Sequence, residues 1–272
     1  MIRDITIGQY YPANSKLHRL DPRVKIMCTL FFLISLFCFQ NIWGYVVATI
    51  FLVAVIRISK VPLKFIVKGL RPVIMLLMIT VLFNLFLTKT GTVIFEMWIL
   101  KITDEGLRTA GFMTVRLIYL ILGSSLMTFT TTPNALTDGI ERLLWPLRKI
   151  KVPVHEIAMM MSIALRFIPI LLEETDKIMK AQQARGADFE EGKLIERVKA
   201  LVPVLVPLFV SAFRRANDLA MAMEARCYRG GAGRTRMKPL KYTKQDGMAY
   251  VCLVVYLVAL VILTRVGGML AA

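Results

Sequence analysis

The feature that most constrains this chain is an uncharged stretch of 31 residues between Lys25 and Arg57. As a single α-helix it would be roughly 46 Å long, whereas the hydrocarbon core of a bilayer is about 30 Å thick. The polar pair Gln40-Asn41 interrupts the stretch near its middle. The pattern therefore predicts a tight helical hairpin with two membrane spans, at 22–40 and 43–57.

Three more apolar runs predict spans at 72–88, 109–131 and 247–264. Hydrophobic residues make up 57% of the chain and charged residues 19%, which is more apolar and less charged than a soluble domain. We therefore expect an all-α integral membrane protein with about five transmembrane helices and a helical coupling region at the cytoplasmic face or interface. The expected divisions are an N-terminal transmembrane region, a cytoplasmic coupling-helix region and a C-terminal span, at 1–131, 132–246 and 247–272.

The net charge of +17 is concentrated in some loops and absent from others. The loop 57–71 and the stretch 229–244 contain no acidic residue, and residues 1–25 are also basic, whereas the loop 89–108 is balanced. Basic loops remain in the cytoplasm, so we expect a multi-pass plasma-membrane protein with a cytoplasmic N-terminus. The stretch 229–244 would also suit anionic lipid or nucleic acid, but topology explains it more simply, and we expect no nucleic-acid partner.

The predicted cytoplasmic region contains two apolar runs, 157–172 and 200–213. Both are too short and too interrupted for confident spans. A polar helical segment follows each one, which predicts two long amphipathic helices whose apolar halves pack beneath the bilayer or dip into it. Pro169 and the pair Pro203/Pro207 are expected to bend these helices.

Several catalytic and metal-binding patterns fail on inspection. The segment 186–194 resembles a phosphate-binding loop, but its glycines are one residue too far apart and no Ser or Thr follows Lys193. His155-Glu156 lacks the second histidine of a zinc-protease helix, and the four cysteines lack zinc-ligand spacing. Because no convincing cluster of acids or histidines is present, a membrane enzyme acting on lipid is disfavoured. We expect no catalytic residue, no metal site and no cofactor in this chain.

Arg116 lies inside the apolar run 109–131. An intramembrane cation is costly, so it is a candidate functional residue. The simpler interpretation, which we favour, is that its side chain snorkels to the outer interface.

The most informative pattern occurs twice. Ala184-Arg185-Gly186 and Ala225-Arg226-Cys227 each place one arginine between small residues at the end of a long helical segment. Gly186 and Gly230 are expected to cap the two helices. Such an arginine can enter an acidic groove and bond bidentately, while its small neighbours allow close approach. The alternative is an arginine that only complements the helix dipole.

Taken with other segments, these motifs make the chain resemble the transmembrane, or T, component of energy-coupling factor transporters, a class of ABC-type importers. The resemblance extends through most of the chain and is carried by segments 15–23, 132–133, 139–143, 164–169, 181–186 and 222–228. One departure is Cys227, which stands where other small residues are common.

The resemblance implies that each Ala-Arg-small motif docks on one of two cytoplasmic ATPase subunits, which bind ATP and Mg²⁺. It also implies a separate membrane-embedded substrate-binding subunit that captures a vitamin or other micronutrient. We expect that subunit to contact the apolar runs of the coupling region, at Ile163, Leu205 and Phe209. The rival interpretation is an ordinary ABC permease subunit that forms its own substrate pathway, for which one coupling site per chain would be expected. The cargo is not encoded in this chain.

Overall fold

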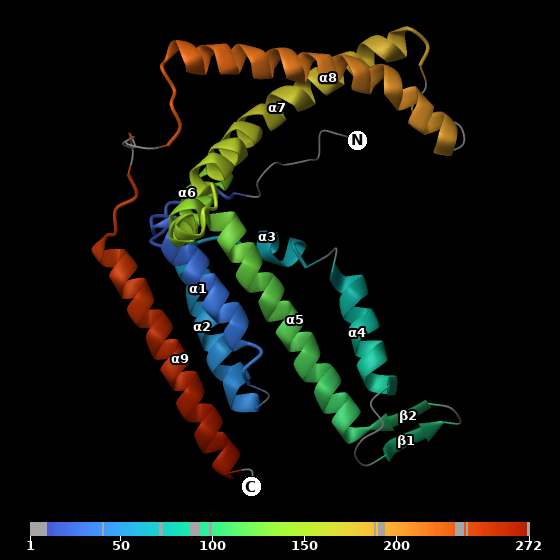
Figure 1. Cartoon of the computed structure of the whole chain (residues 1–272). Coiled ribbons are helices and arrows are strands. Elements are labelled where there is room, and N and C mark those ends of the chain that lie inside the picture. The colour runs from blue at the N-terminus through green and yellow to red at the C-terminus, as the bar shows by residue number, and fades with distance from the viewer. Residues whose placement is uncertain are drawn as a thin grey trace. The chain divides into compact units, whose positions relative to one another are not determined.

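The computed structural model describes residues 10–39, 41–70, 73–87, 93–97, 100–187, 189, 194–231, 237 and 239–270. In these residues the chain is predominantly helical (Figure 1). The helices are α1 (Pro22–Ser35), α2 (Ile42–Ser59), α3 (Leu63–Lys68), α4 (Ile74–Leu87), α5 (Asp104–Thr130), α6 (Pro133–Leu144), the 3₁₀ helix η3 (Trp145–Ile150), α7 (Val154–Ala184), α8 (Leu194–Ala225) and α9 (Lys244–Leu270). The two strands are β1 (Val93–Met97) and β2 (Leu100–Thr103).

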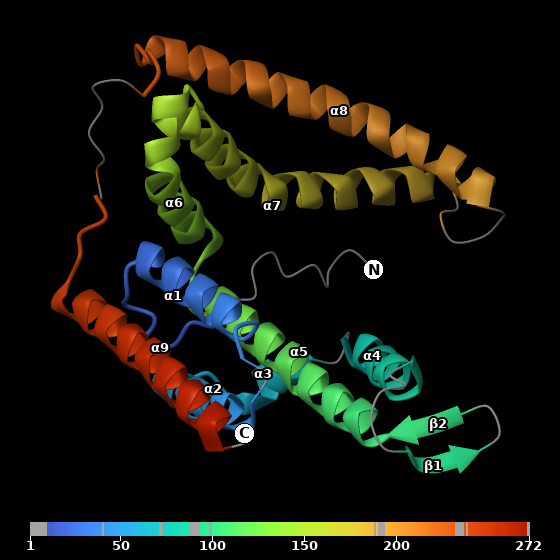
Figure 2. The same ribbon diagram turned by 60° about the horizontal axis from the view of Figure 1, so that its bottom comes forward.

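The chain divides into two compact units. The larger unit, here called the helical bundle, comprises residues 8–140 and 240–272, and the second comprises 1–7 and 141–239. In the bundle, α1, α2, α5 and α9 lie side by side (Figures 1 and 2). α4 packs on α5. The domain boundaries predicted at 131 and 246 divide membrane-spanning from cytoplasmic residues. A division into compact units does not test that distinction, so these boundaries stay a prediction.

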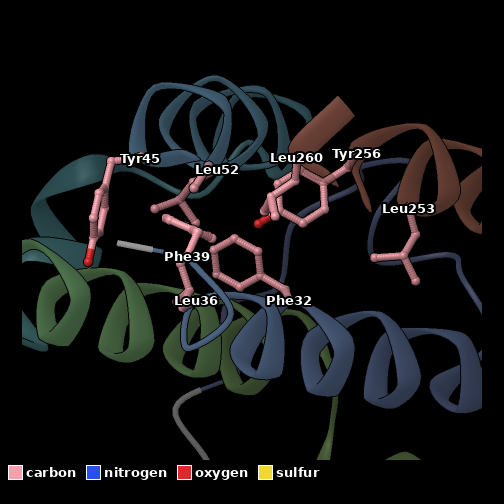
Figure 3. Close-up of a cluster of buried hydrophobic side chains, with 9 residues drawn as sticks. Phe32, Leu36, Phe39, Tyr45, Leu52, Leu253, Tyr256 and Leu260 are labelled. Carbon is pink, nitrogen blue, oxygen red and sulfur yellow. The ribbon is translucent and has the colours of Figure 1, made fainter. Parts of the chain in front are cut away.

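Aromatic and aliphatic side chains of α1, α2 and α9 form the bundle core (Figure 3). The buried members are Phe32, Leu36, Phe39, Tyr45, Ala48, Leu52, Leu253, Tyr256 and Leu260. The Tyr256 hydroxyl lies 2.8 Å from that of Ser35, so the polar end of this buried ring has a hydrogen-bond partner. The predicted hairpin is thus present as α1 and α2, and α9 closes the core.

Five helices in the described part of the chain are long and apolar enough to cross a membrane: α2, α5, α7, α8 and α9. The chain is a mainly helical, multi-pass membrane protein, as expected. The five differ from those predicted, because α1 and α4 have only 14 residues each, about 21 Å of helix. By contrast, the apolar runs of α7 and α8 continue into helices of 31 and 32 residues. By length and composition, α7 and α8 are therefore as able to cross a membrane as the other three helices are. Their cytoplasmic position stays a prediction.

The predicted loop 89–108 contains a small antiparallel hairpin that the sequence analysis missed. β1 pairs with β2, with Glu96 opposite Lys101 and Met97 opposite Leu100. β-branched residues in both segments, together with Phe95 in β1, favour extended backbone. Thr103 is the last residue of the hairpin and also caps α5, because its hydroxyl accepts a hydrogen bond from the Gly106 N–H.

Two aspartates join the N-terminal ends of α1 and α9. Asp21 caps α1 by accepting from the Arg23 backbone N–H and forms a bidentate ion pair with the Arg23 guanidinium. Asp246 accepts from the Asp21 N–H at 2.8 Å and from the backbone N–H and hydroxyl of Thr243, each at 2.7 Å. Burial by itself would raise the pKa of Asp21, but the hydrogen bonds and charge of Arg23 lower this pKa below its ordinary value. The segment 15–23 therefore fastens the start of α1 to a helix more than 200 residues away.

Candidate functional site

The first arginine motif ends α7 in a left-handed turn. Arg185 is the C-cap residue, and Gly186 follows with a φ of +89°. The Gly186 N–H donates to the Gln183 carbonyl at 2.9 Å, and the Ala187 N–H donates to the Gln182 carbonyl at 3.0 Å. These two bonds define a Schellman motif, which requires a left-handed residue after the C-cap. Gly186 supplies that conformation without steric cost, so its predicted capping role is confirmed.

The second motif ends α8 in the same way. The Cys227 N–H donates to the Glu224 carbonyl at 2.8 Å, and the Tyr228 N–H donates to the Met223 carbonyl at 3.0 Å. Cys227 has a φ of +53°. Each residue from 223 to 228 thus matches one from 182 to 187, and Arg226 occupies the position of Arg185.

The prediction that Gly230 caps α8 was wrong. Gly230 has a φ of +82°, but it lies three residues beyond Cys227, which makes the capping bond. The expectation followed the usual preference for glycine at this position, and here a small non-glycine residue adopts the left-handed conformation. The register of the repeated motif would have identified Cys227, because it aligns with Gly186 directly after the arginine.

Both motifs are exposed. The exposed residues include all six predicted docking positions: Ala184, Arg185, Gly186, Ala225, Arg226 and Cys227. Neither guanidinium has a hydrogen-bond or ion-pair partner in the described part of the chain. Each also stands at the negative end of a long helix dipole, so the purely electrostatic explanation remains open alongside docking.

The packing of α7 on α8 places the motifs at opposite ends of an antiparallel pair (Figures 1 and 2). Near the end of α7, Gln182 donates to the Pro203 carbonyl at 3.3 Å. Further back, Glu174 accepts from Ser211 at 2.5 Å and from Arg215 at 2.8 Å. Ile163 lies across a groove of about 250 Å³ that is lined on the other side by Leu219 and Met223. From Pro203 to Met223 an α-helix rises about 30 Å, and the three further residues that lead to each arginine bring the separation of the two motifs to roughly 40 Å.

The chain beyond the second motif is held against the start of α7. A Cβ placed on Gly231 would lie 2.1 Å from the His155 ring, so only glycine allows this approach. The His155 Nδ1 lies 3.1 Å from a carboxylate oxygen of Glu141. His155 therefore has a structural setting in the second unit, and Arg226 projects from an anchored helix end.

The predicted contact residues for a membrane partner fall on two surfaces. Leu205 is 46% exposed and Phe209 is 61% exposed, and both lie on one apolar face of α8. We call this the α8 apolar face; its members are Leu201, Val202, Leu205, Val206, Phe209, Val210 and Phe213. Ile163 instead lines the groove between α7 and α8 with Phe167 and Leu171. The structure brings two of the three together and separates the third.

Arg116 does not snorkel, contrary to the interpretation that we favoured. Its side chain is 8% exposed, and the guanidinium donates to the Phe39 carbonyl at 3.1 Å. The same guanidinium lies over the Phe37 ring, 5.5 Å from the centroid. Arg116 thus links α5 to the turn between α1 and α2, where the Phe39 carbonyl accepts the hydrogen bond that a snorkelling guanidinium would give to water.

Among the described residues, no group of three or more His, Cys, Asp or Glu side chains could hold a metal ion. The segment 186–194 that resembles a phosphate loop lies largely outside the described residues, as do residues 232–236 and 238 of the basic stretch 229–244. Their predicted roles are therefore not addressed by the structure.

Comparison with known proteins gives a consistent result over almost the whole chain. The family model of CbiQ, a cobalt transport protein, matches residues 13–238. An energy-coupling factor transporter transmembrane protein EcfT from Ruminiclostridium cellulolyticum is 54% identical over 266 residues, which cover 98% of this chain and 99% of that protein. Proteins of the same name from Thermosediminibacter oceani and Bacillus subtilis are 57% identical over 250 residues and 49% identical over 255 residues. These alignments cover 92% and 94% of this chain, and 94% and 96% of the two relatives.

Proposed function

Because the chain belongs to the CbiQ family and, with it, to the transmembrane components of energy-coupling factor transporters, we propose that it couples two ATPases to substrate uptake. In this proposal two cytoplasmic ATP-binding cassette subunits bind ATP and Mg²⁺ and hydrolyse the nucleotide. This chain, which is non-catalytic and carries no cofactor, transmits their movement to a separate membrane-embedded substrate-binding subunit. That subunit captures a vitamin or other micronutrient.

The observation that carries the proposal is the pair of equivalent helix ends. Arg185 and Arg226 have the same C-cap geometry, the same small neighbours and no intramolecular partner among the described residues. An exposed guanidinium between small residues suits bidentate bonding to a carboxylate in a groove. Two such ends roughly 40 Å apart suit two separate partners better than one. An ordinary ABC permease subunit gives no reason for two matched motifs in one chain.

The same arrangement accounts for coupling. When two bound ATPases approach or separate on binding and hydrolysing ATP, the forces act on the two ends of one helix pair. The pair is internally braced by the Glu174 contacts with Ser211 and Arg215. A coupling element must interact differently with two states of the complex, and reorientation of a braced pair provides that difference.

The α8 apolar face supports the placement of the substrate-binding subunit. Each large apolar side chain left in water forgoes about 1.5–3 kcal/mol of burial. A cytoplasmic or interfacial α8 therefore needs lipid or protein to cover residues such as Phe209, which is 61% exposed. We place the subunit on this face, and we place the N-terminus and α7–α8 in the cytoplasm from the distribution of basic loops.

The test is co-purification of the complete complex, with transport measured in the same preparations. The variants are Arg185→Ala, Arg226→Ala and the double variant, with Arg214→Ala as the control because Arg214 is an exposed arginine within α8 rather than at its end. Losing one partner of a desolvated charged hydrogen bond costs about 2–5 kcal/mol, so each single variant should reduce transport. The double variant should lose both ATPases.

A third arm changes Phe209→Asp, which should release the substrate-binding subunit and retain the ATPases. All variants should keep the thermal stability of the wild type, because the altered side chains are exposed. Retention of both ATPases and full uptake by the double arginine variant would refute the docking assignment. Two copies of this chain per complex would instead favour the ordinary permease.

A further inference from the structure

The helical bundle contains a cavity that the proposed coupling function does not use. Its volume is about 380 Å³, and it lies between α1, α2, α5 and α9. Most of its lining is apolar; representative residues are Val24, Phe32, Phe51, Leu52, Leu126 and Leu253. Gly123 also lines it, and a side chain there would collide with Phe32, because an added Cβ would be 2.8 Å from that ring.

Apart from Thr29, which lies one turn further along α1, the polar lining residues that form hydrogen bonds or carry charge gather at one end of the cavity. Lys25 is in the first turn of α1, Gln245 is in the first turn of α9 and Thr130 is the last residue of α5, while Lys16 precedes α1. These helix ends lie together, since the Lys25 ammonium donates to the Thr130 carbonyl at 2.7 Å. The cavity is therefore polar and basic at one end and apolar along its length, which is the shape and polarity of an amphiphile.

Lys25 provides a buried positive charge at the polar end. Its side chain is 6% exposed, and its ammonium donates to the carbonyls of His18 and Thr130. An ammonium has three protons to donate, and the described residues provide two acceptors. The nearby acids are already engaged: Asp21 forms an ion pair with Arg23, and Asp246 accepts three hydrogen bonds.

Lys16 adds a second positive charge at the same end. It is exposed and forms no ion pair with any described residue. A phosphate at this position would be within reach of both lysines, while the hydrocarbon part of the same molecule would follow the apolar lining. A zwitterionic headgroup also carries a phosphate, but its own ammonium offsets that charge, so it gains less from two lysines than an anionic headgroup does.

We propose that this cavity is a binding site for one anionic phospholipid. One acyl chain occupies the apolar length between α1, α2, α5 and α9, and the headgroup phosphate binds Lys16 and the third proton of Lys25. A polypeptide partner fits this site less well, because the basic charge is confined to one end and the apolar lining carries no backbone hydrogen-bonding groups that an inserted peptide would need.

The test uses the full chain reconstituted in vesicles of equal parts phosphatidylglycerol and phosphatidylcholine. The chain is then extracted, and native mass spectrometry counts the lipids that remain bound. Ala249→Phe fills the cavity from α9, and Ala54→Phe is its control, because Ala54 is an exposed α2 residue outside the lining. Lys16→Glu reverses the charge at the polar end, and Lys64→Glu, at an exposed α3 lysine, makes the same change elsewhere.

The wild type and both controls should retain one phosphatidylglycerol in preference to phosphatidylcholine. Lys16→Glu should reduce that preference by about fivefold or more, which is the effect of one basic residue at an anionic lipid surface. Ala249→Phe should abolish retention of either lipid, with thermal stability equal to that of Ala54→Phe. The proposal would be overturned if the wild type retained the two lipids equally or retained none. It would also be overturned if Ala249→Phe and Lys16→Glu both behaved like the wild type.

Discussion

Replacing Asp246 with alanine should destabilise the bundle strongly, although Asp246 touches no predicted docking residue. The carboxylate is 1% exposed and accepts three hydrogen bonds. The bond from the Asp21 N–H is buried at both ends, so its donor would lose its acceptor at a cost of about 1–3 kcal/mol. The two bonds from the exposed residue Thr243 are each worth about 0.5–1.5 kcal/mol.

Asp246 also supplies one half of a capping box at the start of α9, because it stands three residues after Thr243 and accepts from the Thr243 N–H. The loss of a negative charge in the first turn adds about 0.3–1 kcal/mol. Together these contributions predict that Asp246→Ala lowers the free energy of unfolding by about 3 kcal/mol or more. Asp246→Asn keeps one acceptor oxygen and should lose less.

The measurement is unfolding in mixed micelles with increasing dodecyl sulfate, followed by far-ultraviolet circular dichroism. Asp104→Ala is the matched control, because Asp104 is also an acid in the first turn of a long helix but is exposed. That control should cost less than about 1 kcal/mol. If Asp246→Ala is no more destabilising than Asp104→Ala, then the junction between α1 and α9 contributes little, and the argument from buried hydrogen bonds is wrong.

Two further predictions concern titration and topology. The pKa of Asp21 lies below its ordinary value of 3.8. Its ion pair should therefore contribute fully to the free energy of unfolding above pH 3.8 and lose this contribution as the pH falls through the lower folded pKa. Asp21→Asn should flatten this part of a stability–pH curve, and an unchanged curve would contradict the assignment. In a cysteine-free background, Asp104→Cys should react with an impermeant maleimide applied from outside whole cells and Lys64→Cys should react only after lysis, whereas the opposite pattern would reverse the proposed orientation.

Much of the helical architecture follows from the sequence because apolar runs and their interruptions are local signals. The hairpin of α1 and α2, and helices α5 and α9, lie close to their predicted bounds. The two long helices predicted in the coupling region are present as α7 and α8, with Pro169 and Pro203/Pro207 inside them. Composition alone does not reveal whether a proline ends a helix or lies within one.

The candidate site shows the same limit. Sequence repetition identified both arginines, and Gly186 revealed how the first helix ends. The contact of Asp246 with Asp21 joins residues 225 positions apart, and no local pattern reports such a pairing. Likewise, the buried guanidinium of Arg116 donates to the Phe39 carbonyl in the turn between α1 and α2, so this contact could be seen only once the bundle was assembled.

The antiparallel packing of α7 on α8 has a mechanical consequence. If the two proposed partners, bound at opposite ends of the pair, move together, the pair only translates. If they move in opposite directions, the pair rotates. With Arg185 and Arg226 roughly 40 Å apart, an opposed displacement of a few ångströms at the two ends rotates the pair by roughly ten degrees. Under the proposed function, the helix pair is therefore a differential sensor: it responds to the change in spacing between its two proposed partners and is insensitive to their joint motion.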